Sequence, residues 1–168
     1  MKIEVKKGIK SKYKLDFPTM INEILETVPE THILGLHKIQ ILGDSPEKKR
    51  RSSYGFYYGK REGENQPRIV ICVNNIYSRL PRLLLKIKFI PKMFLAGTLY
   101  HEIAHHYQRL KHGFKKDGWE KDADIYAKKM MREHFIFQLY LLKILHLLLK
   151  VLFYPLFAVN KIRGRKKE

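Results

Sequence analysis

The sequence contains His101-Glu102-Ile103-Ala104-His105, the pattern His-Glu-x-x-His, in its second half. Residues four apart lie one above the other on a helix, so both imidazoles face the same side and can bind one metal ion. Glu102, next to the first histidine, is placed to take a proton from a water beside that ion. Shuffling a chain of this composition would produce the pattern only about 0.02 times. The segment therefore predicts a metal site on a helix.

The residues on either side of the motif predict a helix over residues 92–112. An apolar-leaning stripe recurs at helical spacing through this segment. Its members are Leu95, Leu99, Ile103, His106 and Leu110. Gly97 lies one turn before His101 on the same face, and its missing side chain is expected to leave room beside the metal.

A catalytic zinc ion takes three protein ligands and keeps a fourth position open, so the motif needs a third ligand. His112 lies on the ligand face, but it is about 10 Å beyond His105 along a continuous helix, which is too far. A metzincin-type site is excluded, because Gln108 and Lys111 stand where that motif requires Gly and His.

Glu120 is a better candidate for the third ligand. Gly113 lets the chain turn back, so that a second helix, expected over residues 117–134, presents its first-turn carboxylate to the two histidines. Asp124 lies one turn later on the same face, where it can accept the free ring N–H of a ligand histidine. As alternatives, Glu120 completes a capping box with Asp117, which does not exclude ligation, and Asp124 belongs to an exposed helix face.

The motif followed by Glu120-x-x-x-Asp124 resembles the site of gluzincin zinc metallopeptidases. Over residues 20–134, strands are followed by the helix that carries the motif (the motif helix, residues 92–112) and by the helix that carries Glu120 (the glutamate helix, residues 117–134). This order is similar to that of minigluzincins and of the catalytic domains of integral-membrane gluzincin peptidases. The resemblance implies a zincin-like fold and one Zn²⁺ ion. It also implies the following roles: metal ligation by His101, His105 and Glu120, general base and acid catalysis by Glu102, and a hydrogen bond from a ligand histidine to Asp124.

The remaining pattern predicts an α+β domain over residues 1–134. Apolar and aromatic-rich segments indicate a small antiparallel or mixed sheet of about three strands, at residues 33–42, 54–58 and 68–73. The last two are expected to form an antiparallel hairpin. A helix is expected over residues 17–28, and a long loop or short helix over the basic, apolar segment 74–91. The sheet is expected to pack on the motif helix and the glutamate helix.

The chain has 168 residues and a formal net charge of +18, which suits an acidic partner such as nucleic acid or an anionic membrane. Lys and Arg are scattered and no nucleic-acid motif is present, so nucleic-acid binding is not expected. Cys72 is the only cysteine, which excludes an intrachain disulfide and predicts a buried thiol. The amino terminus does not have the pattern of a signal peptide, so a cytoplasmic location is expected.

Residues 135–168 form a second segment. Residues 135–159 are the most apolar part of the chain and predict a helix, followed by a basic end with Lys161, Arg163, Arg165, Lys166 and Lys167. Lys143, His146 and Lys150 fall within about 60° of one another around that helix. Each lysine costs about 2.5 to 3.5 kcal/mol at the centre of a bilayer, so full spanning is near break-even. The pattern favours a helix at an anionic membrane surface; packing on its own domain or a partner helix is the alternative.

These observations predict a zinc metallopeptidase that hydrolyses a peptide or protein substrate through a water activated at the metal. The alternative is a non-catalytic, zinc-stabilised binding or regulatory module that contacts nucleic acid or a membrane through its basic surface. Dependence of the function on Glu102 distinguishes the two.

Overall fold

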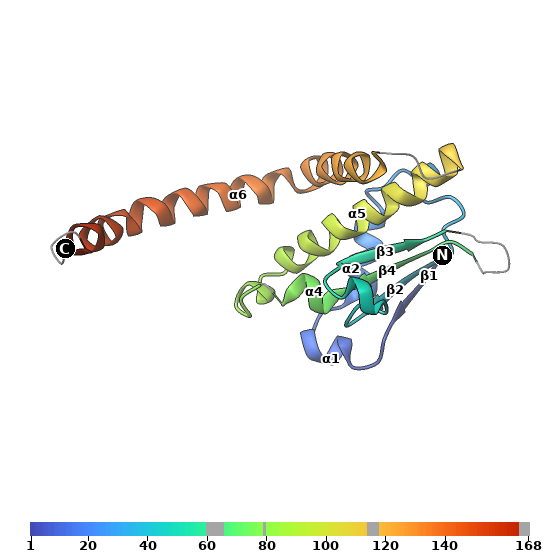
Figure 1. Ribbon diagram of the computed structural model, residues 1–168, viewed down its shortest axis with the longest axis horizontal. Coiled ribbons are helices and arrows are strands. Elements are labelled where there is room, and N and C mark those ends of the chain that lie inside the picture. The colour runs from blue at the N-terminus through green and yellow to red at the C-terminus, as the bar shows by residue number, and fades with distance from the viewer. Residues whose placement is uncertain (60–65, 79, 114–117, 165–168) are drawn as a thin grey trace. The chain divides into compact units, whose positions relative to one another are not determined.

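The computed structural model describes residues 1–59, 66–78, 80–113 and 118–164, with only the backbone for residues 10, 11, 149 and 152–164. These residues form an α+β fold, as predicted, with a small mixed sheet and several helices (Figure 1). The chain divides into two compact units, Met1–His134 and Phe135–Glu168.

Four strands of the first unit form one sheet in the order β1-β2-β4-β3. Strands β1 (Lys2–Val5), β2 (Lys38–Leu42) and β4 (Arg68–Cys72) run parallel, and β3 (Gly55–Tyr58) pairs antiparallel with β4. The expected antiparallel pairing is therefore confirmed. Strand β1 was not predicted, because it is a short segment of mixed polarity whose pairing partner lies beyond three intervening helices.

The prediction of a strand over residues 33–42 is wrong in its first half. Residues Glu30–Ile33 form the short helix α3, and Gly35 has a φ of +74°, in the left-handed region that glycine adopts without strain. The strand begins only at Lys38, where Ile39 and Ile41 are fully buried and alternate with more exposed residues. Successive side chains of a strand point to opposite faces of the sheet, and this alternation of burial is seen from Lys38 onward.

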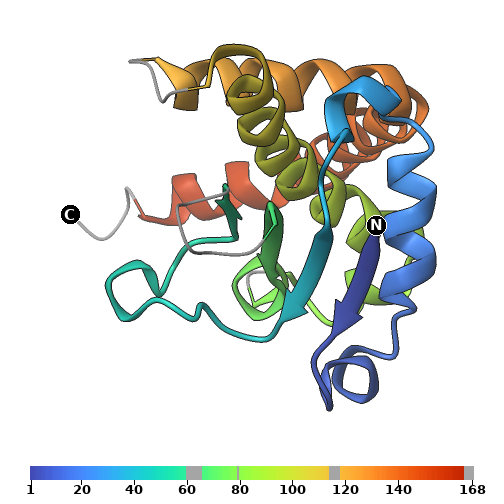
Figure 2. The same cartoon turned by 90° about the vertical axis from the view of Figure 1, so that its right-hand side faces the viewer.

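Helices α2 (Phe17–Leu25) and α5 (Phe89–His112) lie on the sheet, α2 beside β1 and α5 across β3 and β4 (Figures 1 and 2). Both present fully buried side chains at helical spacing. These are Phe17, Ile21 and Ile24 of α2, and Leu95, Leu99 and Ile103 of α5. The motif helix is thereby held against the edge strand β3.

Helix α4 (Val73–Tyr77) and the 3-10 helix η2 (Leu84–Lys86) agree with the short helix or loop expected over residues 74–91. The boundaries differ, because α4 begins at the last residue of the predicted strand 68–73 and residues 89–91 already belong to α5. A further helix, α1 (Ile9–Tyr13), follows β1, and a 3-10 helix, η1 (Lys48–Arg50), precedes β3.

A separate apolar cluster contains Phe56, Val70 and Cys72, with Leu42 and Tyr58 packed against it. The thiol of Cys72 is buried, as predicted, and burial raises its pKa to about 11. The thiol therefore stays protonated and serves as a small apolar core group.

Helix α6 (Trp119–Gly164) crosses the boundary between the two units. In the first unit it buries Trp119, Ala123, Ala127 and Met130. Phe135, the first residue of the second unit, has non-helical dihedral angles (φ −123°, ψ 20°), and the helix continues beyond it. The predicted helix start at residue 117 and the basic residues 165–167 lie outside the described residues. Among the helices that the structure describes, none combines the length and apolar character needed to cross a membrane.

Candidate metal centre

Two helices supply the side chains of the predicted site. Helix α5 ends at Gly113, which has a φ of +73° and donates its backbone N–H to the carbonyl of Arg109 at 2.9 Å. Glycine adopts a positive φ without strain, which suits it to the end of a helix. Gly118, with a φ of +88°, directly precedes α6. The first turn of α6 thus lies where its carboxylate reaches the histidines of α5.

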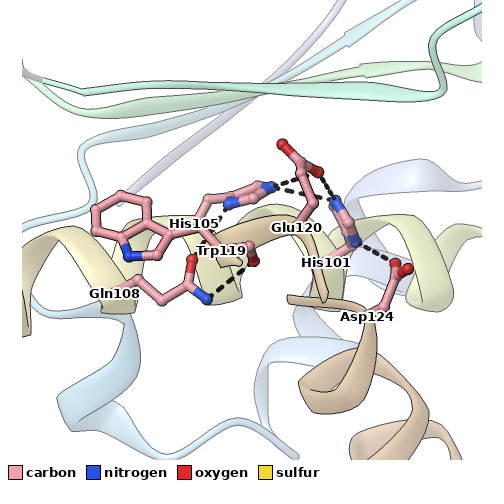
Figure 3. Close-up of polar contacts among 6 residues, drawn as sticks. All are labelled: His101, His105, Gln108, Trp119, Glu120 and Asp124. Carbon is pink, nitrogen blue, oxygen red and sulfur yellow. Dashed lines mark hydrogen bonds and ion pairs between the residues drawn. The ribbon is translucent and has the colours of Figure 1, made fainter. Parts of the chain in front are cut away.

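His101, His105 and Glu120 meet at one point (Figure 3). The Nε2 atoms of the two histidines are 3.1 Å apart, and each lies 3.4 Å from Oε2 of Glu120. The histidines are partly buried, with side-chain exposures of 24% and 14%, whereas Glu120 is 70% exposed. The three atoms form a nearly equilateral triangle that faces solvent on the Glu120 side.

This triangle fits a zinc ion. Zinc binds imidazole nitrogen at about 2.0 to 2.1 Å and carboxylate oxygen at about 2.0 to 2.2 Å, so ligand atoms at tetrahedral angles are about 3.3 to 3.5 Å apart. The two separations of 3.4 Å match that spacing, and the separation of 3.1 Å between the histidine nitrogens is slightly shorter. A zinc ion held by these three atoms would have three protein ligands, which is the number typical of catalytic rather than structural zinc sites.

The other ring nitrogen of each histidine also has an acceptor. Nδ1 of His101 lies 3.0 Å from Oδ1 of Asp124, and Nδ1 of His105 lies 3.3 Å from Oε1 of Gln108 (Figure 3). Gln108 in turn donates from Nε2 to the carbonyl of Trp119 at 3.1 Å. Each acceptor favours the tautomer with its proton on Nδ1, and a neutral ring in that tautomer has a lone pair on Nε2. Both Nε2 lone pairs are therefore directed to the point shared with Glu120.

Glu102 lies on the buried side of α5 and is 6% exposed. Burial, with a smaller contribution from the negative charge of Glu120, raises the pKa of Glu102 to about 8, while a backbone hydrogen bond from Tyr57 opposes the shift. A methyl group on Gly55 would come within 2.8 Å of Oε1 of Glu102, so this glycine of β3 allows the carboxylate to fit. The edge strand and the proposed general base are in direct contact.

His106 is fully buried beside the site. Its Nε2 lies 2.9 Å from the carbonyl of Leu34, and its Nδ1 lies 3.2 Å from the hydroxyl of Tyr57. Nε2–H therefore donates to the carbonyl and Nδ1 accepts from the hydroxyl, which describes a neutral ring. Burial lowers the pKa of His106, in agreement with that state. The histidine joins α5 to β3 directly after the motif.

Three residues of α5 outside the motif differ from or complete the sequence-based prediction. Leu110 is 48% exposed and does not belong to the buried stripe. Gly97 faces the second helix, since a methyl group there would meet Sδ of Met131 at 4.0 Å. His112 is exposed and is not among the three residues that meet, as its distance along the helix predicted.

Sequence reasoning missed two contributors to the site. Gln108 lies three residues after His105, so the spacing that places neighbours on one helix face was the available signal. The contact between Gly55 and Glu102 joins residues far apart in the chain, and no local sequence pattern predicts it.

Comparisons of the chain with protein-family models, with curated proteins and with solved structures found no match.

Proposed function

We propose that this protein is a zinc-dependent metallopeptidase, with His101, His105 and Glu120 as the metal ligands. The observation that carries the proposal is the triangle of Nε2, Nε2 and Oε2 atoms, with separations of 3.1 to 3.4 Å. Two imidazoles and one carboxylate are typical ligands of catalytic zinc, whereas calcium and magnesium prefer sets made of oxygen atoms.

Glu102 is proposed as the general base and acid. Zinc held by His101, His105 and Glu120 would supply a Lewis acid that activates a water and polarises a carbonyl oxygen. Glu102 then accepts the proton of the attacking water and returns it to the leaving amine.

Strand β3 is proposed to hold the substrate. It is one of the two outer strands of the sheet, paired with β4 on one side, and its Gly55 contacts Glu102. An extended peptide can add to such an edge through backbone hydrogen bonds. This placement brings a peptide bond near the proposed base. We further propose that the fold is zincin-like and the site of the gluzincin type, on the basis of the motif, the glutamate helix and the edge strand.

Metal analysis of the purified full chain tests the ligands. We expect one zinc ion per chain in the wild type and a large loss in His101→Ala. The matched control is His112→Ala, which removes an exposed histidine of the same helix and should keep the zinc. Sub-stoichiometric zinc in the wild type that His101→Ala does not reduce would rule out the proposed site.

Cleavage of a peptide library tests the catalytic step. Glu102→Gln should retain zinc and lose hydrolysis, because the amide cannot accept the proton. If the wild type binds zinc and cleaves nothing in the library, and Glu102→Gln keeps the biological effect, the protein is instead a zinc-stabilised binding module.

A further inference from the structure

The second unit presents an unusual number of apolar side chains to solvent. Among its described side chains, the exposed fraction is 73% for Phe137, 62% for Leu147, 60% for Leu148 and 66% for Val151. Soluble proteins rarely expose apolar side chains in such a continuous group, and a large exposed patch marks a binding surface.

The charged side chains between residues 135 and 167 have one sign. The sequence has no Asp or Glu from residue 135 to residue 167, whereas Lys143 and Lys150 lie on the helix and are exposed. Both lysines and His146 fall within about 60° around the helix axis, because successive residues are about 100° apart. The helix therefore carries a narrow basic stripe between apolar surfaces.

We propose that α6 between Phe135 and Val151 binds the surface of an anionic lipid bilayer, with its axis in the plane of the membrane. Apolar side chains enter the acyl region, and Lys143 and Lys150 remain at the level of the phosphates. A bilayer surface offers an apolar layer bordered by negative charge, which matches the two features of the helix. This proposal is independent of the peptidase activity.

Other occupants match these features less well. In a second copy of the helix, the lysines would meet no acidic side chain, since the sequence between residues 135 and 167 has none. A nucleic acid would pair with the two lysines but would leave the exposed leucines and Phe137 in water.

Flotation of the full chain with vesicles tests the proposal. The vesicles contain either phosphatidylcholine alone or phosphatidylcholine with 30% phosphatidylglycerol. We expect binding to the anionic vesicles that weakens with added salt and does not vanish, since salt screens the charges and leaves apolar insertion in place.

Two pairs of variants separate the contributions. Lys143→Gln with Lys150→Gln should weaken binding to anionic vesicles by about fivefold per lysine. The control, Lys121→Gln with Lys128→Gln, removes two exposed lysines of α6 in the first unit and should have little effect, at the same net charge. Circular dichroism verifies that each variant is folded.

Leu147→Gln with Leu148→Gln should weaken binding to the anionic vesicles by about tenfold per residue. Leu34→Gln with Leu83→Gln is the control, since these leucines are 70% and 71% exposed in the first unit.

Three results would overturn the proposal. One is equal binding by both lysine double variants, which would assign the attraction to net charge alone. Another is the absence of binding together with a dimer that Leu147→Gln and Leu148→Gln dissociate, which would assign the surface to self-association. The last is the absence of binding together with a loss of thermal stability in those leucine variants, which would show that the helix packs within the chain.

Discussion

Replacing Gly55 by alanine tests how closely β3 packs against the proposed general base. An added methyl group would lie 2.8 Å from Oε1 and 2.9 Å from Cγ of Glu102, and 3.0 Å from Cγ2 of Thr98. Side-chain methyl groups essentially never approach other atoms below 3.0 Å, so the strand or the glutamate must move. Glu102 is buried, which leaves its side chain little room to move.

The matched control is Gly97→Ala, which adds the same methyl group to the motif helix. There the nearest atom outside the helix backbone is Sδ of Met131 at 4.0 Å, an ordinary contact. Glycine in a helix interior costs about 0.5 to 1 kcal/mol relative to alanine, so this variant should raise the free energy of unfolding by that amount. Overpacking at Gly55 should lower it by about 1 to 3 kcal/mol.

Thermal and denaturant unfolding of the two variants, with chelator present, measure these opposite changes in the free energy of unfolding. For a chain of this size, 1 kcal/mol corresponds to about 2 to 4 °C in Tm, so Gly55→Ala should melt roughly 2 to 12 °C below the wild type. If the glutamate side chain moves instead of the strand, the loss of stability is smaller and hydrolysis decreases. A Gly55→Ala protein with unchanged stability and unchanged hydrolysis would refute the close packing, and so would a Gly97→Ala protein that is destabilised as much.

Further predictions concern the groups around the proposed metal ligands and the buried carboxyl of Glu102. Asp124→Asn should weaken zinc affinity by about 10- to 100-fold, because the hydrogen-bond partner of a ligand histidine sets the orientation and basicity of that histidine. Competition with a fluorescent chelator measures the affinity. Asp122→Asn, which changes an exposed carboxylate of the same helix, is the control and should leave the affinity unchanged. Gln108→Leu removes the acceptor of the other ligand histidine and should also reduce affinity, but less, because a neutral amide is a weaker acceptor than a carboxylate. Burial raises the pKa of Glu102 from 4.5 to about 8, so the metal-free folded protein keeps a proton that the unfolded chain releases. The stability from this group is present below pH 4.5 and is lost as the pH rises through about 8. Glu102→Gln should flatten the pH dependence of Tm over that range in the presence of chelator, and an unchanged slope would contradict the assigned burial.

The spacing of residues along one helix was readable from the sequence. His101 and His105 share a face because they are four residues apart, and Asp124 follows Glu120 at the same interval. Helical geometry fixes these relations locally, so they need no information from the rest of the chain. The sequence also predicted that the chain turns back between α5 and α6, because Gly113 marks the end of α5. The α+β class and the hairpin of β3 and β4 followed from apolar alternation and turn residues.

The tertiary structure alone decided which segments meet across the chain. The parallel strand β1, the contact of Gly55 with Glu102 and the burial of His106 between Leu34 and Tyr57 all join residues distant in sequence. A local pattern specifies which face of an element is apolar, but it does not specify which partner covers that face. The free energy of such contacts arises only when the sheet and helices pack together. The surroundings of Glu102 could therefore be seen only in the folded chain.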